Sequence, residues 1–282
     1  MALRGSELLP DKANEILETL SPAGRVDHLA LTVEALDQPL DRWELAATVT
    51  DATTAPFRKV PGLVGIDASI SANEESATVW IDTQDFALML PNVYREPIRL
   101  TSVLGTLEGR WQQDALFLEH GLLLGSAPEH DAAVQFEMDI PFSKQSSVPL
   151  EMRLAASVLD APVGIRDAYV PYRMPPPAYL WLQQALPAGQ IESGIFLWHG
   201  GFKPYGHPGQ TMQLAADLSE VTLEYQPGWP AARLAESRLR LDNTRIDAWS
   251  SEGQLATLSL VDSAVGLQVG SDAIWLALQT QS

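Results

Sequence analysis

The chain has 282 residues, which is enough for one large or two ordinary hydrophobic cores. Its formal net charge of −18 argues against binding to nucleic acid or to an anionic membrane surface through electrostatics. The sequence contains no cysteine, which excludes disulfides and thiolate metal sites. No stretch reaches the roughly 18–20 apolar residues of a transmembrane helix, and no signal peptide is recognised.

Two short helices are expected. The first covers Leu8–Leu20, where Ala13, Ile16 and Leu17 share one side of the helix and a Pro-Ala-Gly sequence follows. The second covers Ala178–Leu186, directly after a run of three prolines, and it ends at a second Pro-Ala-Gly sequence. A proline run suits the first turn of a helix, because the N–H groups of that turn have no partner in the helix.

Elsewhere, apolar and polar residues alternate with a period of two. This pattern is clearest in 43–50, 64–71 and 133–140, and the segments are separated by Pro-Gly and Asn-containing turns. Strands with one apolar and one polar face, joined by short turns, are typical of an antiparallel sheet. The sequence therefore predicts a mainly β protein with a long antiparallel sheet.

The apolar phase of the strands is expected to form one continuous concave surface, because alternate residues of a strand share a face and paired strands bring like faces together. The residues expected to line it are Leu45, Val49, Ile66, Ile70, Val79, Ile81, Val134, Phe136, Met138, Leu154, Leu214, Leu218, Leu239 and Leu241.

The second half of the sequence repeats the order of the first. Pro22-Ala23-Gly24 recurs as Pro187-Ala188-Gly189, 165 residues later, and Leu45-Ala46-Ala47 recurs as Leu214-Ala215-Ala216, 169 residues later. Pro61-Gly62 recurs 166 residues later as Pro227-Gly228. We predict a unit over residues 1–168 and a second, incomplete copy over 169–282, joined in one groove.

No sequence motif indicates catalysis. The five histidines have no metal-ligand spacing, and there is no nucleophile elbow, phosphate-binding glycine loop or dinucleotide fingerprint. The acidic residues are scattered over turns and polar faces, which does not make a catalytic pair. We expect no catalytic residue, no cofactor and no metal. The eight tryptophans are explained mainly by core and interface positions.

Several stretches resemble the YhdP branch of the AsmA-like (DUF3971-type) bacterial envelope proteins. The most specific is Leu223-Glu224-Tyr225-Gln226-Pro227-Gly228-Trp229-Pro230. Others are Tyr169-Val170-Pro171, the helix around Trp181-Leu182, and Pro61-Gly62-Leu63-Val64-Gly65 with Leu90-Pro91-Asn92 and Arg95-Glu96-Pro97. The resemblance covers about Leu20 to the end of the chain.

The resemblance implies a large Gram-negative protein that is anchored in the inner membrane and crosses the periplasm as a curved, half-open β-groove. Such proteins are thought to carry phospholipid to the outer membrane, which would set outer membrane permeability. The expected partners are phospholipid acyl chains, other parts of the same longer chain and envelope proteins, but no nucleic acid. The chain would be an internal fragment without the anchor, because the apolar run Ala273–Leu278 lacks a following partner strand.

Alternation alone leaves the covering of the apolar face open. A second sheet could cover it, as in a β-sandwich, or acyl chains could cover it in an open groove. The alternative to lipid transport is a scaffold that binds envelope proteins through its sheet edges. An enzyme acting on envelope glycans is the third hypothesis.

Overall fold

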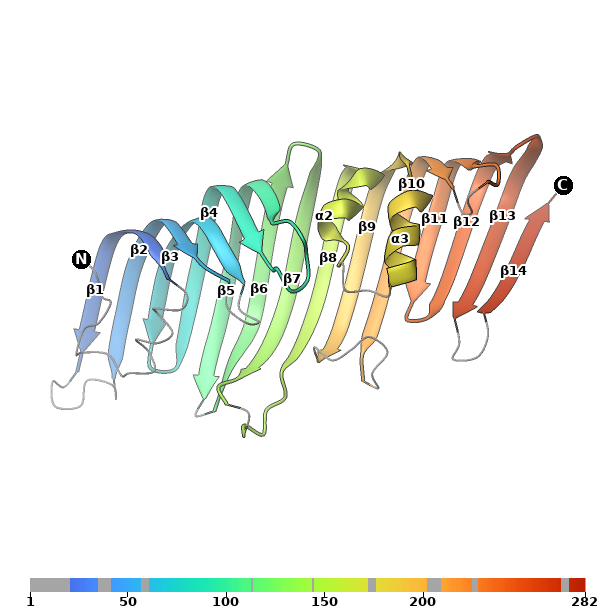
Figure 1. Ribbon diagram of the computed structural model, residues 1–282. Coiled ribbons are helices and arrows are strands. Elements are labelled where there is room, and N and C mark those ends of the chain that lie inside the picture. The colour runs from blue at the N-terminus through green and yellow to red at the C-terminus, as the bar shows by residue number, and fades with distance from the viewer. Residues whose placement is uncertain are drawn as a thin grey trace.

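The computed structural model describes residues 21–34, 42–56, 61–112, 114–143, 145–171, 176–201, 209–224, 228–269 and 274–281. These residues form one 14-stranded sheet in which the strands follow one another in sequence order (Figure 1). All neighbouring strands are antiparallel, and most of them are joined by hairpins or short loops, whereas the longer connection between β8 and β9 contains helices. The mainly β, antiparallel fold expected from the alternation is confirmed.

The strands are long, and their bounds follow the alternating segments of the sequence. They are β1 (Ala23–Val33), β2 (Trp43–Thr54), β3 (Gly62–Asn73), β4 (Ser76–Met89), β5 (Ile98–Gln112), β6 (Ala115–Ala127), β7 (His130–Pro141), β8 (Glu151–Pro162), β9 (Ala188–Gly201), β10 (Thr211–Leu223), β11 (Ala232–Asp242), β12 (Arg245–Leu255), β13 (Leu258–Val269) and β14 (Ile274–Gln281).

Between β8 and β9 lie the short 3₁₀ helix η1 (Val163–Ile165) and the helices α2 (Arg166–Tyr169) and α3 (Pro176–Ala185). Helix α3 matches the helix predicted over Ala178–Leu186, and it begins in the proline run. Helix α2 was not predicted, because its single turn is too short to show a helical period. The helix predicted over Leu8–Leu20 lies outside the described residues.

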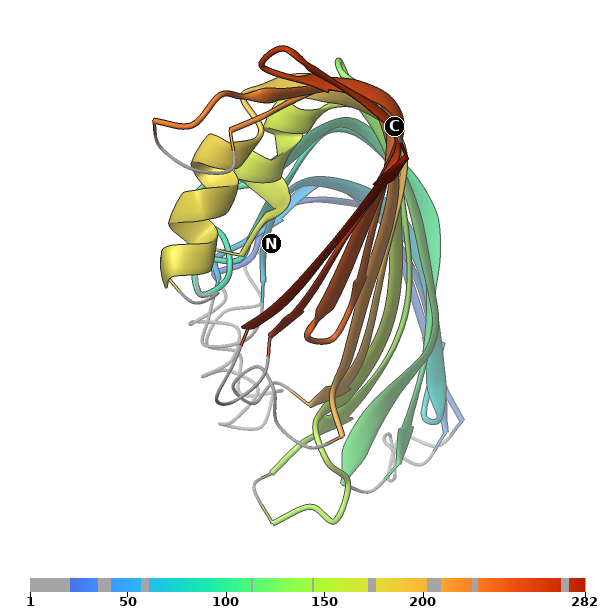
Figure 2. The same ribbon diagram turned by 90° about the vertical axis from the view of Figure 1, so that its right-hand side faces the viewer.

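The sheet is curved, and α2 and α3 lie on its concave side (Figure 2). We call this side the inner face and the convex side the outer face. The position of α2 identifies the residues of the inner face. Tyr169 at the end of α2 contacts His130, the first residue of β7. His130 lies on the same side of β7 as the apolar residues of that strand, because they alternate with it at a period of two. Since paired residues share a face, the registers extend this assignment across the sheet.

The strands bend at bulges, and several bulges carry an acidic residue in the left-handed conformation. Examples are Asp51 (φ 51°), Asp85 (φ 55°) and Glu220 (φ 51°). Aspartate tolerates this conformation better than most residues, and a bulge bends its strand. Acidic residues that the sequence scatters along the strands therefore help to curve the sheet.

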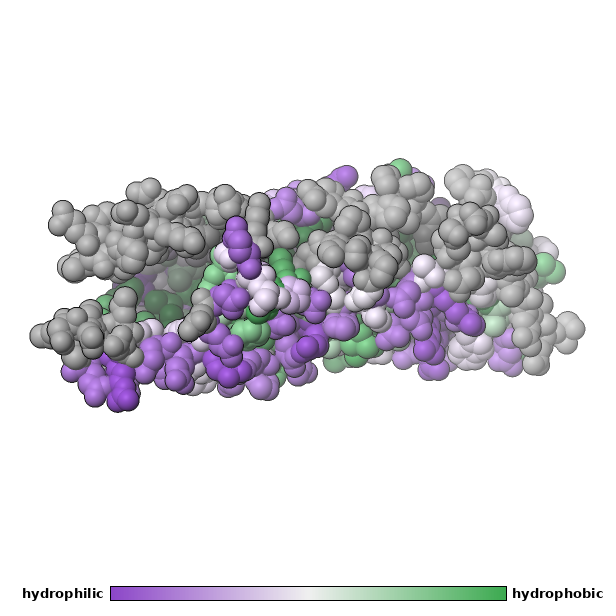
Figure 3. Space-filling model, turned by 90° about the horizontal axis from the view of Figure 1, so that it is seen from below, coloured by the Kyte–Doolittle hydropathy of each residue, from purple (hydrophilic) through white to green (hydrophobic). Residues whose placement is uncertain are grey.

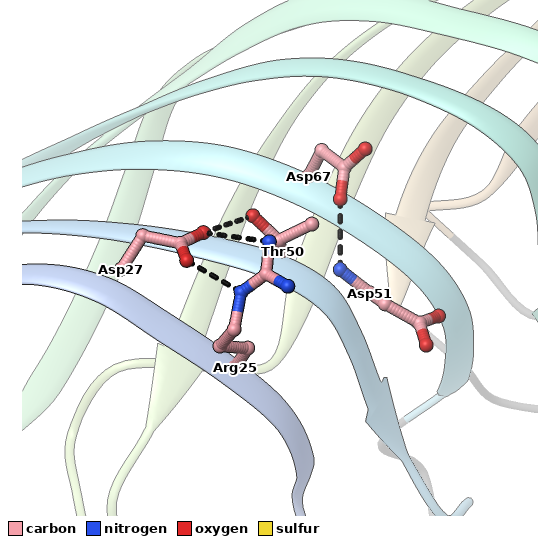
Figure 4. A network of polar contacts seen from close by, with 5 residues as sticks. All are labelled: Arg25, Asp27, Thr50, Asp51 and Asp67. Atoms are coloured by element: carbon pink, nitrogen blue, oxygen red, sulfur yellow. Dashed lines mark hydrogen bonds and ion pairs between the residues drawn. The ribbon is translucent and has the colours of Figure 1, made fainter.

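The bulge at Asp51 is held by a polar network on the outer face (Figure 4). The backbone N–H of Asp51 donates a hydrogen bond of 2.8 Å to the carboxylate of Asp67 on β3. Beside it, Asp27 accepts hydrogen bonds from the hydroxyl of Thr50 and from the guanidinium of Arg25. These bonds lower the pKa of Asp27, with the Thr50 hydroxyl as the largest cause.

The buried core is small for a chain of this length. Ala68, Ile81, Phe86 and Val103 form the buried cluster on the inner face of β3–β5. The accessible surface of the chain is 18542 Å², whereas a compact monomer of 30.7 kDa exposes about 12,000 Å². No second sheet covers the inner face among the described residues, so the β-sandwich alternative does not apply to them.

The register of β1–β2 recurs in β9–β10, including its two bulges. The pair Ala23↔Thr53 corresponds to Ala188↔Thr222, with offsets of 188 − 23 = 165 and 222 − 53 = 169. When 165 is added to the residue numbers of β1 and 169 to those of β2, every residue pair of β1–β2 becomes a pair of β9–β10. Asp51 then corresponds to Glu220, which has the same left-handed conformation. This agreement supports the predicted repeat independently of the sequence anchors.

The correspondence continues into β3–β4 and β11–β12 at the offset of 169, for example from Ala68↔Ile81 to Ser237↔Ser250. The Pro-Gly anchor does not fit this offset, because Gly62 lies in β3 whereas Gly228 lies in a turn before β11; Pro227 lies outside the described residues. The sheet runs on through the predicted boundary at residue 168. The division into two units stays a prediction.

Candidate functional site: an open apolar groove

The fourteen residues expected to line a concave surface lie on the inner face. One register row contains Ile70, Val79, Phe136 and Leu154, which are linked through Leu107 and Gly121. The next rows place Val49, Ile81, Val134, Leu214 and Leu241 in one line, and Leu45 and Met138 in another. Ile66, Leu218 and Leu239 belong to the same phase, next to the bulges.

These side chains are only partly covered. Ile81 is buried, and the other thirteen are half-buried. Figure 3 shows hydrophobic residues in a hollow at the left and in the middle of the view, with hydrophilic residues along its lower side. The inner face is therefore an apolar groove that is partly open to solvent, and we call it the groove.

Small residues shape the floor of the groove. A Cβ atom added at Gly121 would lie 2.7 Å from the ring of Phe136 on the neighbouring strand, so the ring lies over the glycine. Near the N-terminal end, Trp43 and Trp111 stack with ring centroids 6.2 Å apart. The floor thus combines flat aromatic rings with aliphatic side chains.

The helices form a cover over part of the groove, and Arg166 holds it together. The guanidinium of Arg166 donates hydrogen bonds to the carbonyls of Val163, Gln183 and Leu186, at 2.8–3.1 Å. Its side chain is 14% exposed, and Nε lies 3.5 Å from the exposed carboxylate of Asp167. A buried cation is thereby satisfied mainly by the carbonyls at the C-terminal end of α3.

Two further contacts attach this cover to the sheet. The imidazole of His130 lies 2.7 Å from the hydroxyl of Tyr169, and burial lowers the pKa of His130. The guanidinium of Arg95 lies 5.3 Å above the ring of Tyr179 on α3, a cation–π contact. Arg95 belongs to the loop between β4 and β5, so two stretches that carry the sequence resemblance meet here.

Sequence alternation missed several groove residues because bulges change the phase within a strand. In β6, Leu118 and Leu123 both lie on the inner face, although their numbers have different parity. The register shift between them, at Glu108/Gly109 of the paired strand, explains the change. A glycine or acidic residue inside an alternating run is the signal that could have located such shifts.

The outer face carries an apolar patch that the alternation rule did not predict. Trp80, Leu104, Leu122 and Leu124 are 47–55% exposed and line a shallow depression of about 620 Å³. They belong to neighbouring strands β4–β6. Trp80 points away from Val79 and Ile81, as its phase in the sequence predicts.

The four histidines that the structure describes do not gather into a metal site. His28, His120 and His199 are exposed on separate strands, whereas His130 contacts Tyr169. His207 lies outside the described residues. Within the described ranges, no group of three or more histidine, aspartate and glutamate side chains could hold a metal ion. The helices in those ranges are also too short and too polar to span a membrane.

Comparison with known proteins identifies the family. The family model described as "YhdP protein" matches residues 3–277. The chain belongs to the YhdP family. The resemblance expected from the sequence motifs is thus confirmed, and with it the association of this family with the bacterial envelope. No curated protein and no solved structure matches the chain.

Proposed function

We propose that the groove holds phospholipid acyl chains and conducts them between the inner and outer membranes. The protein is then a periplasmic part of an envelope protein anchored in the inner membrane, and it acts without catalysis. The observation that carries this proposal is the long apolar inner face whose large side chains remain half-buried.

The physical argument is that exposed apolar surface needs a cover. Monomers rarely expose a contiguous apolar patch larger than a few hundred Å². The groove runs across fourteen strands, and the described chain covers it only near α2 and α3. Acyl chains can cover such a surface without fixed polar partners, which suits a face that offers mainly aliphatic and aromatic contacts.

The test is native mass spectrometry of the purified chain, which detects co-purified phospholipid. Met138→Lys places a charge on the inner face and should lower the lipid content. Gln135→Lys is the matched control, because it places the same charge on the exposed outer face of the same strand. A parent protein without phospholipid, or a Met138→Lys variant with unchanged lipid content, would contradict the proposal.

The edge strand β1 supports a second candidate, a scaffold that binds envelope proteins through its sheet edge. Among the described residues β1 pairs only with β2, and Leu29 and Leu31 are 60% and 63% exposed. An exposed strand edge can add a strand from another protein. A photo-crosslinking residue at Ala30 that captures an envelope protein, in a chain that carries no lipid, would favour the scaffold.

A further inference from the structure

The groove contains one polar row. Ser237, Ser250 and Ser263 are paired in register across β11, β12 and β13. Their places in the alternation, two residues from Leu239 and Ala248, put them on the inner face. They are 8%, 5% and 8% exposed, so the hydroxyls are set into the floor of the groove. We call these three residues the serine row.

One hydroxyl of the serine row has no partner among the described residues. Ser250 Oγ lies 2.9 Å from the carbonyl oxygen of Glu236 and 3.0 Å from that of Glu252, and Ser263 Oγ lies 3.4 Å from that of Val261. Ser237 Oγ is buried and makes no hydrogen bond within the described part of the chain. A buried hydroxyl without a partner destabilises the folded chain, so its presence on the inner face points to a ligand atom that accepts a hydrogen bond from it.

The repeat shows that the fold does not require serines here. The offset of 169 carries Ala68 onto Ser237 and Ile81 onto Ser250. In the first unit these two apolar residues belong to the buried cluster. The equivalent position therefore accepts alanine, and the hydroxyl of Ser237 is a difference between two otherwise corresponding strand pairs.

The surroundings restrict the chemistry of the ligand. Leu239, Leu241 and Leu214 continue the apolar floor beside the serine row, so the rest of the ligand is apolar. On the strands of the row, Glu236 and Glu252 are paired with each other and exposed on the outer face, directly behind the row. Their negative charges disfavour an anionic group nearby. An uncharged oxygen acceptor attached to an apolar chain satisfies both conditions.

We propose that the Ser237 hydroxyl of the serine row donates a hydrogen bond to an ester carbonyl of a glycerolipid whose acyl chains lie on the neighbouring apolar rows. Adjacent strands are about 4.8 Å apart, so the three hydroxyls span about 10 Å of the groove. The ester region would thus have a preferred resting place in an otherwise uniform floor. This inference rests on the proposed function, because it assumes that the groove holds lipid.

The test compares two lipids that differ only in the carbonyls. Diacyl phosphatidylethanolamine and its dialkyl ether analogue, with matched chains, compete for the purified chain, and native mass spectrometry measures the bound ratio. The parent should prefer the diester about fivefold, which corresponds to about 1 kcal/mol for one neutral hydrogen bond. Ser237→Ala, which installs the residue of the first unit, should bind both lipids equally.

Ser69→Ala is the control, because it removes an exposed hydroxyl from the outer face; it should keep the preference of the parent. Equal binding of the two lipids by the parent would overturn the role of the serine row while leaving the lipid groove intact. A Ser237→Ala variant that keeps the preference would overturn it as well. A parent that binds neither lipid would contradict the proposed function itself.

Discussion

An aspartate placed in the groove should be tolerated far better than one placed in the buried cluster, although the two sites are close together. Ile70 and Ile81 lie on adjacent strands, and Val79 is both the partner of Ile70 and two residues from Ile81. Ile81 is 7% exposed, whereas Ile70 is half-buried. The same substitution, isoleucine to aspartate, therefore tests whether the inner face is open.

The expected magnitudes differ clearly. Ile81→Asp loses about 1.5–3 kcal/mol of apolar burial and adds several kcal/mol for an unpaired buried carboxylate. The sum approaches the 5–15 kcal/mol stability of a typical native protein, so this variant should unfold. Ile70→Asp loses about half of the burial term, about 1–1.5 kcal/mol, because its carboxylate reaches solvent through the open groove.

Thermal unfolding followed by circular dichroism is the assay. A loss of 1–1.5 kcal/mol lowers Tm by about 2–6 °C in a chain of this size. Ser69→Asp on the exposed outer face of the same strand is the control, and its Tm should match that of the parent. If Ile70→Asp unfolds as Ile81→Asp does, the inner face is a sealed core and the reasoning is refuted.

Three further predictions concern the cover and the repeat. Burial lowers the pKa of His130 in the folded protein, so below about pH 6.5 the unfolded chain binds more protons than the folded one, and the free energy of unfolding should fall as the pH decreases through that range. Chemical unfolding of His130→Gln at pH 5–7 should show a weaker decline with decreasing pH. A decline equal to that of the parent would exclude His130 as its cause. Arg166→Met should cost about 2–4 kcal/mol, since three partly buried carbonyls lose a charged donor. A Tm equal to that of the parent would contradict this role of Arg166. Gly24→Ala and Gly189→Ala should lower Tm by similar amounts, because both glycines have positive φ (128° and 141°) and face backbone atoms of the next strand. Clearly different decreases in Tm would argue against two equivalent units.

The sequence predicted the faces of the sheet well because strand geometry has a strict period of two. Ile70, Val79, Phe136 and Leu154 could be assigned to one face from alternation alone, and hairpin connections brought those faces into register. The prediction failed where the period is broken, as in β6, because one extra residue at a bulge shifts every later side chain.

Tertiary features were harder to predict. The cover depends on hydrogen bonds from Arg166 to carbonyls up to twenty residues away in sequence, and no local sequence pattern predicts such a contact. The serine row looks like ordinary polar residues in each strand, and it becomes a feature only when three registers align Ser237, Ser250 and Ser263. The outer patch around Trp80 likewise forms from several strands.

The matching registers of β1–β4 and β9–β12 indicate that the sheet repeats after a fixed number of strands, and therefore after a fixed length of groove. Strand β9, which would begin the predicted second unit, follows β1 by eight positions in the sheet, which at about 4.8 Å per strand is an advance of about 38 Å. Inserting or deleting one whole unit would lengthen or shorten the groove in steps of that size, while each remaining strand kept its partners and its face. If the groove bridges the two membranes as proposed, the number of units would determine the distance that it spans, and a wider gap could be matched by adding a unit without changing the individual strands.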